Sequence, residues 1–380
     1  MYELEFLIAT AVFLVMTVFV FFNYPESWRR NRMFCLVLIL WHLSGMISVA
    51  FIFTAFREIP FTGVKYSVAR IGTFYYLMMM LMTGMFALRL IIRRIYLYLL
   101  QKLNRPVTET KQSILMDKRV HAMCFIALSY LITVMGYFNI DILHTTEYDV
   151  QIPKTADVKN LNIVFLADVH AGSGNWEFTY SELVKQVNAA KPDVLLLGGD
   201  IFDETTSEQD VYLIHWFLEN IEPPRYGVYY VYGNHDDARD DWAGQQMRDM
   251  GVNVPNDQMV LLGDDIQLIC HDDPSYSSLS YEELFASLSI DHTKPVILLT
   301  HRPQQLQLLS EKGVDLMMAG HTHGFNIPFF LGIAFSNDMF YGRWDYSTLT
   351  AITTSGVAAW GWHYKWPARS EIVSIHAHFQ

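Results

Sequence analysis

The residues best suited to chemistry are histidines and aspartates that follow short apolar stretches in the second half of the chain. "MMAGHTHG" (317–324) places His321 and His323 one residue apart, directly after such a stretch. Asp, Asn and His supply the oxygen and nitrogen ligands of metal ions, and they are costly to bury unpaired. The pattern therefore predicts a metal site. It recurs in four more clusters: Asp168 and His170; Asp200 and Asp203; Asn234, His235 and Asp236; and His301.

The spacing and number of these residues refine the prediction. In extended backbone, residues i and i+2 point to the same side, so Asp168 with His170, and His321 with His323, are each expected to present two ligands in one direction. The absence of thiolates among the candidate ligands favours Mn, Fe, Zn or Mg over a structural zinc cage. The ligands are too many for one tetrahedral ion. Two divalent ions about 3.5–4 Å apart, sharing a bridging carboxylate, would accommodate them.

Six apolar stretches that lead into or lie among these clusters are predicted to be β-strands. Most are apolar throughout, as is typical of strands buried on both faces. Amphipathic segments at 181–190, 211–220 and 281–288 lie between some of them, which indicates an α/β layered domain. In such sheets ligands bind beyond the carboxyl ends of the strands, where the polar clusters fall. The predicted strands are 161–168, 193–200, 227–236, 265–273, 295–301 and 314–321.

The N-terminal part of the chain, residues 1–145, is predicted to be a multi-pass transmembrane anchor. Crossing a bilayer as a helix takes about 20 apolar residues, because unpaired backbone groups are too costly in lipid. Four stretches meet this requirement, and a soluble domain is predicted from 155 to 380. The four transmembrane helices are expected at about 6–22, 33–56, 71–92 and 120–140.

The charge distribution differs between the two parts. Residues 1–149 hold 14 Lys and Arg against 9 Asp and Glu, whereas the remainder holds 13 against 30. Because the part of the chain after residue 149 is strongly acidic, nucleic acid is not expected as a partner. Placing the first and third interhelical loops in the cytoplasm puts ten basic residues inside and three outside. With four spans, we therefore expect a cell-membrane protein whose catalytic domain is extracytoplasmic.

Set out in order, the clusters read D-x-H, G-D-x-x-D, G-N-H-D, H and G-H-T-H. Over residues 159–380 this pattern resembles the calcineurin-like metallophosphoesterase superfamily. "LADVHAG", "LLTHRPQQL" and "AGHTHG" are similar to the branch of YkuE-like phosphoesterases and transmembrane proteins with a metallophosphoesterase domain. The resemblance implies a four-layer α/β/β/α sandwich with a dimetal site at the strand ends, preceded here by the all-α four-helix transmembrane region. The block "CHDDP" (270–274), with His271, Asp272 and Asp273, also matches the family but has no assigned role.

The resemblance also implies roles for individual residues. Asp200 would bridge the two ions, His235 would lie near the leaving-group oxygen as general acid, and Asp203 would orient a neighbouring group. Asp236 and Asp237 are expected to orient His235 or to cap the next helix. By matching motif positions, one metal would be held by Asp168, His170, Asp200 and His323, and the second by Asp200, Asn234, His301 and His321.

These features predict a membrane-anchored, metal-dependent phosphoesterase that hydrolyses a phosphate ester or pyrophosphate bond with metal-activated hydroxide. The anchor suggests a phosphorylated small molecule or a lipid-linked substrate. Arg302 could reach a substrate phosphate, and a surface role is an equal alternative. One alternative function is a catalytically weak metal-binding sensor or scaffold of the same fold. Another is a transport or partner-binding unit formed by the helices, which the scarcity of intramembrane charge disfavours.

Overall fold

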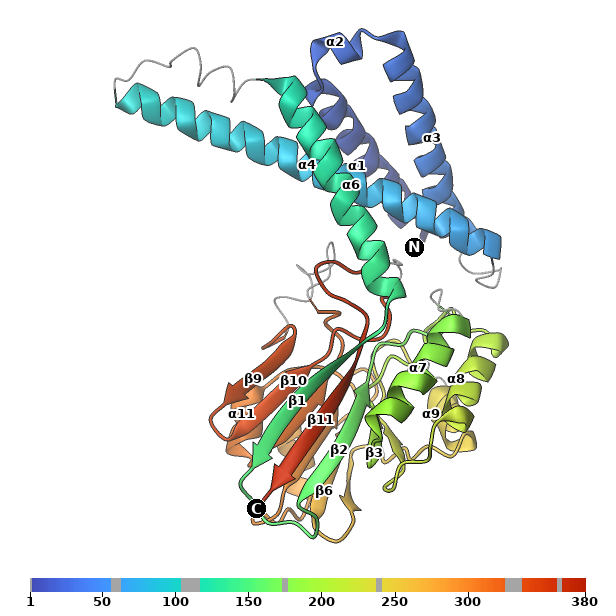
Figure 1. The fold of residues 1–380 in the computed structure, drawn as a ribbon, viewed down its shortest axis with the longest axis vertical. Helices are drawn as coiled ribbons and strands as arrows, with labels where there is room; N and C mark the ends of the chain where they lie inside the picture. Colours follow the sequence, from blue (N-terminus) through green and yellow to red (C-terminus); the bar gives the residue numbers. More distant parts are fainter. Residues whose placement is uncertain are drawn as a thin grey trace. The chain divides into compact units, whose positions relative to one another are not determined.

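The chain forms two compact units, Met1–Met135 and Gly136–Gln380. The computed structural model describes residues 2–55, 63–103, 117–172, 177–236, 241–324, 337–360 and 364–380. Within these ranges the first unit is helical, and all of the strands belong to the second unit (Figure 1).

The helical unit contains long apolar helices. Among residues whose side chains are described, Arg70–Lys102 and Lys118–Asp141 are long and apolar enough to cross a membrane, and Thr10–Asn23 and Arg32–Gly45 are shorter apolar helices. Two candidate spans are therefore present, and the four-helix transmembrane region stays a prediction. The helices are α1 (Tyr2–Asn23), α2 (Glu26–Arg29), α3 (Arg32–Ala55), α4 (Gly63–Lys102) and α6 (Lys118–Asp141), which continues into the second unit.

Helix α4 extends well beyond the span predicted at 71–92. It continues without a break through Arg93 and Arg94 to Lys102. Those charges end the apolar stretch, but they do not end the helix. Leu, Arg and Lys favour helix, and this segment contains no Gly or Pro that would stop it.

The second unit contains two mixed sheets. The first has the order β1 (His144–Ile152), β11 (Glu371–Phe379), β2 (Asn160–Leu166), β3 (Val194–Leu197), β4 (Val228–Tyr230). The second has the order β5 (Gln258–Leu262), β6 (Ile266–His271), β7 (Val296–Thr300), β8 (Leu316–Ala319), β10 (Leu349–Thr353), β9 (Gly342–Tyr346). β2 runs parallel to β3, and β7 runs parallel to β8. The predicted mixed α/β architecture is therefore confirmed.

A core of buried apolar side chains joins the two sheets face to face. Phe165 and Leu196 of the first sheet belong to one cluster with Leu268, Leu299 and Met318 of the second. All five are fully buried, and burying apolar side chains of this size is a main source of folding free energy. This cluster sets the two sheets together, so the loops at their strand ends can meet.

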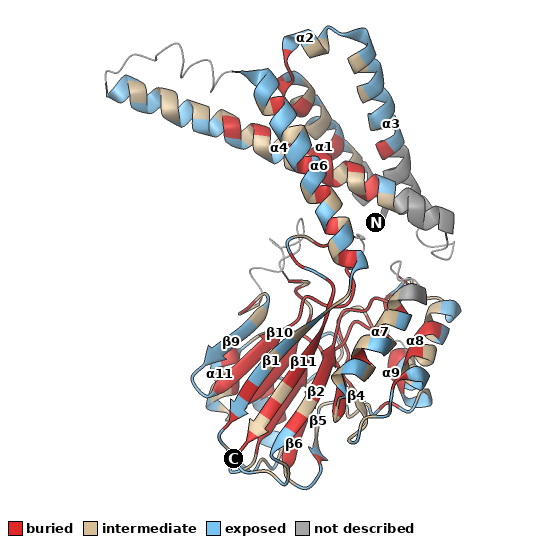
Figure 2. Cartoon of the chain, in the orientation of Figure 1, coloured by how far each residue is buried: buried red, intermediate tan, exposed pale blue. Residues whose placement is uncertain are grey.

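Helices cover the outer face of each sheet. On the first sheet, β2 and β3 pack with α7 (Glu177–Ala190), α8 (Glu208–Asn220) and α9 (Trp242–Asp249). On the second sheet, β7 and β8 pack with α10 (Tyr281–Ser287) and α11 (Leu306–Glu311). β2, β3, β7 and β8 are largely buried, whereas the edge strands β1 and β9 and the outer sides of the helices are exposed (Figure 2). The observed order of layers is helices, sheet, sheet, helices.

All six predicted strands are present, but each is shorter than predicted. The apolar stretches continue past the ends of the strands into the loops that carry the polar clusters. Five further strands, β1, β5, β9, β10 and β11, were not predicted. β1 lies before residue 155, where the soluble domain was expected to begin, and it pairs in parallel with β11 from the other end of that unit.

We predict that Phe165→Ala strongly destabilises the second unit, because it leaves a cavity between the sheets. The expected loss is about 3–5 kcal/mol. For a domain of this size each kcal/mol lowers the thermal midpoint by about 2–4 °C. The full chain in detergent micelles is melted, with Leu261→Ala as the control, since Leu261 is exposed. Equal midpoints for the two variants would contradict this account of the core.

Candidate metal centre

Strand ends from both sheets contribute the predicted site residues. Asp168 and His170 follow β2, and Asp200 follows β3. His301 comes directly after β7. The remaining residues lie after β4 (Asn234 and His235) and after β8 (His321 and His323). The carboxyl ends of these strands therefore carry every predicted ligand, as expected for a ligand site in an α/β sheet.

The backbone at these positions differs from the prediction. Asp168 and His170 have φ values of 52° and 46°, and His321 and His323 have 70° and 50°. These residues lie in left-handed loop conformations, so the argument from extended i, i+2 geometry was wrong. Asp200 shares the feature, with φ 52°. Left-handed residues other than glycine cost free energy, and they persist where surrounding structure enforces them, commonly at functional sites.

Hydrogen bonds between the loops enforce these conformations. The amide of Asp168 donates to the carbonyl of Gly199 at 3.0 Å, and that of His170 donates to the carbonyl of Asp200 at 2.9 Å. Across the sheets, the amide of His321 donates to the Asp168 carboxylate at 3.0 Å. The strained loops therefore hold one another in place.

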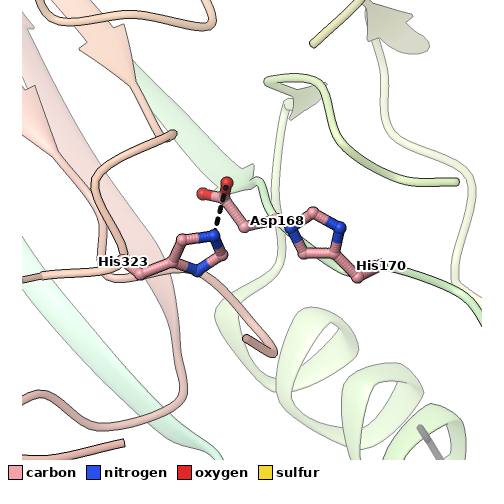
Figure 3. A group of neighbouring side chains, drawn as sticks. All are labelled: Asp168, His170 and His323. Carbon is pink, nitrogen blue, oxygen red and sulfur yellow. Dashed lines mark ion pairs between the residues drawn. The ribbon is translucent and has the colours of Figure 1, made fainter. Parts of the chain in front are cut away.

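The first cluster consists of Asp168, His170 and His323 (Figure 3). One possible ligand atom from each lies within 4.8 Å of the others. Nε2 of His323 is 3.8 Å from Oδ1 of Asp168, and the His170 and His323 rings stack at 5.2 Å. In the described part of the chain, both ring nitrogens of His170 and Nδ1 of His323 are buried without a hydrogen-bond partner. Such atoms are rare in folded proteins, and nitrogen lone pairs so placed fit a metal ion.

The second cluster consists of Asp200, His301 and His321, with Asn234 beside them. Nδ1 of His301 donates to the carbonyl of Gly198 at 2.8 Å. Since a carbonyl only accepts, this bond leaves the lone pair of the neutral ring on Nε2. Nε2 lies 3.2 Å from Oδ2 of Asp200 and 3.2 Å from Oδ1 of Asn234. A cation bound between them would accept electron pairs from all three atoms, Nε2 of His301, Oδ2 of Asp200 and Oδ1 of Asn234.

Asp200 lies between the clusters. Its Oδ2 is 3.7 Å from Nε2 of His170 and 3.2 Å from Nε2 of His301. Its Oδ1 accepts the backbone amide of His235 at 2.7 Å. One carboxylate therefore reaches both groups, as the predicted bridging role requires, although metal ligation by these residues stays a prediction.

Burial and charge set the protonation of the imidazoles. Burial, reinforced by nearby positive charge, lowers the pKa of both His321 and His323 to about 3, so these rings are neutral and able to bind a metal. Burial also disfavours the cation of His301, but the Asp200 carboxylate outweighs it and raises that pKa to about 10. Asp200 thus attracts positive charge at the position where a metal is predicted.

Asp236 and Asp203 support the loops. The Asp236 carboxylate accepts the amides of Asp200, Phe202 and Gly233 at 2.7, 2.9 and 2.7 Å. It therefore fixes the Asp200 and Asn234 loops to each other, in place of the predicted contact with His235 or a helix cap. Asp237 lies outside the described residues. Oδ2 of Asp203 is 3.8 Å from Nδ1 of His170, too far for a hydrogen bond, so its expected orienting role stays a prediction. Oδ1 of Asp203 accepts the amide and the hydroxyl of Thr205 at 2.7 and 2.6 Å.

His235 is held by two residues that sequence reasoning missed. Its Nδ1 lies 3.3 Å from Oε2 of Glu204, and its ring stacks on Trp360 with centroids 4.6 Å apart. Burial alone would lower the pKa of His235, but the hydrogen bond to Glu204 and the charge of Asp200 outweigh it and raise that pKa. Glu204 directly follows Asp203 in the predicted motif, and this adjacency is a usable signal. Nothing in the local sequence singles out Trp360.

Lys365 is a third residue that was missed. It is fully buried, and its Nζ donates to the carbonyls of Ser355 and Gly356 at 2.6 and 2.5 Å. The same loop returns to the first cluster, where the amide of Ala358 donates to the carbonyl of Asp168 at 2.8 Å. Lys365 therefore braces the loop beside Asp168. Burial lowers the pKa of its ammonium to about 7, and the nearby Asp168 carboxylate opposes that shift.

The "CHDDP" block has a supporting role. Asp272 accepts the amide of Tyr232 at 3.0 Å, which ties β6 to the loop that carries Asn234. Asp273 pairs with Arg302 through two bonds, 2.5 Å to Nε and 3.0 Å to Nη2. His271 pairs with Asp257 at 2.7 Å and lies outside both clusters.

Comparisons with known proteins identify the family of this chain. The family model described as calcineurin-like phosphoesterase matches residues 161–325. An uncharacterized metallophosphoesterase of Aquifex aeolicus is 30% identical over 215 residues, which are 54% of this chain and 78% of that protein. Another from Helicobacter pylori is 28% identical over 282 residues, 70% of this chain and 74% of the relative. A Danio rerio transmembrane protein with metallophosphoesterase domain is 27% identical over 255 residues, 60% of this chain and 56% of the relative.

The chain belongs to the calcineurin-like metallophosphoesterases, a family of metal-dependent hydrolases of phosphoesters. The predicted family and the predicted enzyme class are therefore confirmed. The transmembrane relative and the two candidate spans suggest membrane association. The matched region spans about half to three quarters of these relatives.

We predict that Gly233→Ala disrupts the second cluster. A Cβ at this position would lie 2.2 Å from Oδ1 and 2.4 Å from the amide nitrogen of Asp200, so the carboxylate must move. Metal content per chain, measured by elemental analysis after loading with Mn²⁺, is expected to fall. Gly84→Ala is the control, since a Cβ there meets nothing within 4 Å. Full metal content in Gly233→Ala would contradict the placement of Asp200 at the metal centre.

Proposed function

We propose that this protein is a membrane-anchored dimetal phosphoesterase. The observation that carries the proposal is the Asp200 carboxylate, which reaches the first cluster at 3.7 Å and the second at 3.2 Å. Asp168, His170, Asp200 and His323 would hold one divalent ion, and Asp200, Asn234, His301 and His321 the other. When bound, the ions would activate a water molecule and offset charge on the phosphoryl oxygens.

The protein's own residues orient the reaction. His235 lies beside the first cluster, its ring 5.5 Å from that of His170. We infer that His235 protonates the leaving oxygen, while Glu204 and Trp360 hold its ring in place. The amide of His235 donates to Asp200, so the loop after β4 that carries the proposed acid also holds the carboxylate of the loop after β3. A general acid of this kind contributes about 10²–10⁴-fold to the rate.

The substrate proposal starts from the anchor. A domain attached to a membrane meets phosphate groups carried by lipids or by small molecules at the surface. The excess of acidic residues in the second half disfavours nucleic acid. Two divalent ions would offset that acidity at the site itself, so the phosphate could still bind.

The catalytic proposal predicts different outcomes for two variants. Asp200→Asn is expected to lose both metal and hydrolysis of an aryl phosphate, because the bridging carboxylate is changed. His235→Ala is expected to retain metal but to lose about 10²-fold or more in kcat. Asp249→Asn, which changes an exposed carboxylate, is the control. EDTA should abolish hydrolysis, and added Mn²⁺ should restore it.

Turnover also separates this proposal from the alternative of a metal-binding scaffold. A scaffold would bind metal in the wild type without hydrolysing the aryl phosphate. Equal rates for wild type, Asp200→Asn and His235→Ala would likewise overturn the catalytic proposal. Metal content alone does not distinguish the two functions, so both measurements are made on each protein.

We further propose four spans with the phosphoesterase unit on the extracytoplasmic side, supported by the charges of the interhelical loops. Two exposed positions test this, Lys185 on α7 and Arg30 between α1 and α3. In a background with Cys35 and Cys124 changed to Ser, a membrane-impermeant maleimide applied to intact cells is expected to label Lys185→Cys but not Arg30→Cys. Permeabilised cells, in which both label, are the control. The reverse pattern would overturn the orientation.

A further inference from the structure

A cavity of about 300 Å³ lies beside the metal centre and takes no part in the chemistry described above. It is formed by the end of β6, the loop into α10, the end of β7 and the segment before α11. We propose that this cavity binds an uncharged, hydroxyl-rich part of the substrate, that is, a sugar or polyol joined to the phosphate. The inference rests on the proposed function and specifies its substrate class.

The floor of the cavity offers a hydrogen-bond acceptor. His271 is buried, and its Nδ1 lies 2.7 Å from Oδ1 of Asp257. Because a carboxylate accepts, Nδ1 carries the proton, and in the neutral tautomer Nε2 keeps a lone pair that can accept a hydrogen bond. No described residue donates to Nε2. A substrate hydroxyl can fill that role.

The walls offer hydrogen-bond donors. Thr300 Oγ1 accepts the hydroxyl of Tyr281 at 3.1 Å, which leaves the Thr300 hydroxyl hydrogen available. Arg302 uses Nε and Nη2 on Asp273, and its Nη1 has no partner among the described residues. A hydroxyl group both donates and accepts, so a cavity presenting both functions suits a polyol.

The charges around the cavity disfavour a second phosphate there. The Arg302 guanidinium is neutralised by the fully buried Asp273. Asp257 accepts a hydrogen bond from His271, and Glu283 adds a further carboxylate to the lining, so carboxylates outnumber cations around the cavity. No uncompensated positive charge lines the cavity among the described residues, so burying an anion there would cost desolvation free energy. Neutral hydroxyls that find hydrogen-bond partners avoid that cost.

The cavity is also connected to the metal centre. Two residues that line it, Thr300 and Arg302, flank the predicted ligand His301 in the chain. The cavity therefore lies next to the loop that carries a ligand of the second cluster. A phosphate at the metal centre could extend its alcohol group into this space.

Filling the cavity tests the inference in the full chain, loaded with Mn²⁺ in detergent micelles. Ser278 lines the cavity, is exposed and lies outside the metal centre. Ser278→Trp is expected to lower kcat/KM for glucose 1-phosphate by about tenfold or more, through loss of hydroxyl hydrogen bonds. Hydrolysis of phenyl phosphate, which has no hydroxyls on its leaving group, should stay within about twofold. Ser278→Ala leaves the cavity open and serves as the matched control.

A binding measurement keeps this test independent of turnover. Methyl α-glucoside, a neutral sugar without phosphate, is expected to give saturation-transfer NMR signals with wild type and Ser278→Ala but not with Ser278→Trp. Absence of binding to wild type, or equal loss of both substrates in Ser278→Trp, would overturn the cavity proposal. If wild type binds the sugar but fails to hydrolyse phenyl phosphate and glucose 1-phosphate, the proposed function is overturned and the cavity proposal is not.

Discussion

The buried carboxylate of Asp200 is the constraint on which the rest of the site depends. Its backbone amide donates to Asp236, and its carbonyl accepts from His170. Its two oxygens face the amide of His235 on one side and the rings of His170 and His301 on the other. Because loops from both sheets meet at this one residue, the packing of the sheets and the geometry of the site cannot vary independently.

The fold could be predicted only where its signal is local. β3, β7 and β8 are short and consist almost entirely of apolar residues, so the local sequence is enough to predict them. β1 and β11 contain alternating polar residues, and they pair in parallel although more than 200 residues separate them. No local pattern encodes such a pairing. It depends on the core between the sheets, which forms only when distant segments meet.

The site could be predicted in composition but not in conformation. Residue type and order identified the atoms that gather at the strand ends. The left-handed backbone of Asp168 and His321 was not foreseen, because it is enforced by hydrogen bonds between separate loops. Lys365 and Trp360 were missed for a related reason, since only loop packing brings them to the site. Sequence identifies candidate ligands, and tertiary structure determines what supports them.

The balance of buried charge gives an independent argument for two cations. Asp168, Asp200, Asp203 and Asp236 are all buried around the two clusters, whereas Lys365 is the one buried ammonium beside them in the described ranges. In the forms that would bind metal, four ionised carboxylates, one ammonium and neutral imidazoles leave three negative charges uncompensated in a site of low dielectric, an expensive arrangement. Without metal, protons relieve part of that charge, since burial raises the pKa of Asp168 to about 7 and, despite burial, the Asp200 carboxylate raises that of His301 to about 10. One divalent ion would leave the site negative and repel a phosphate. Two would make it positive, which supports the dimetal proposal and explains how so acidic a chain could bind an anionic substrate.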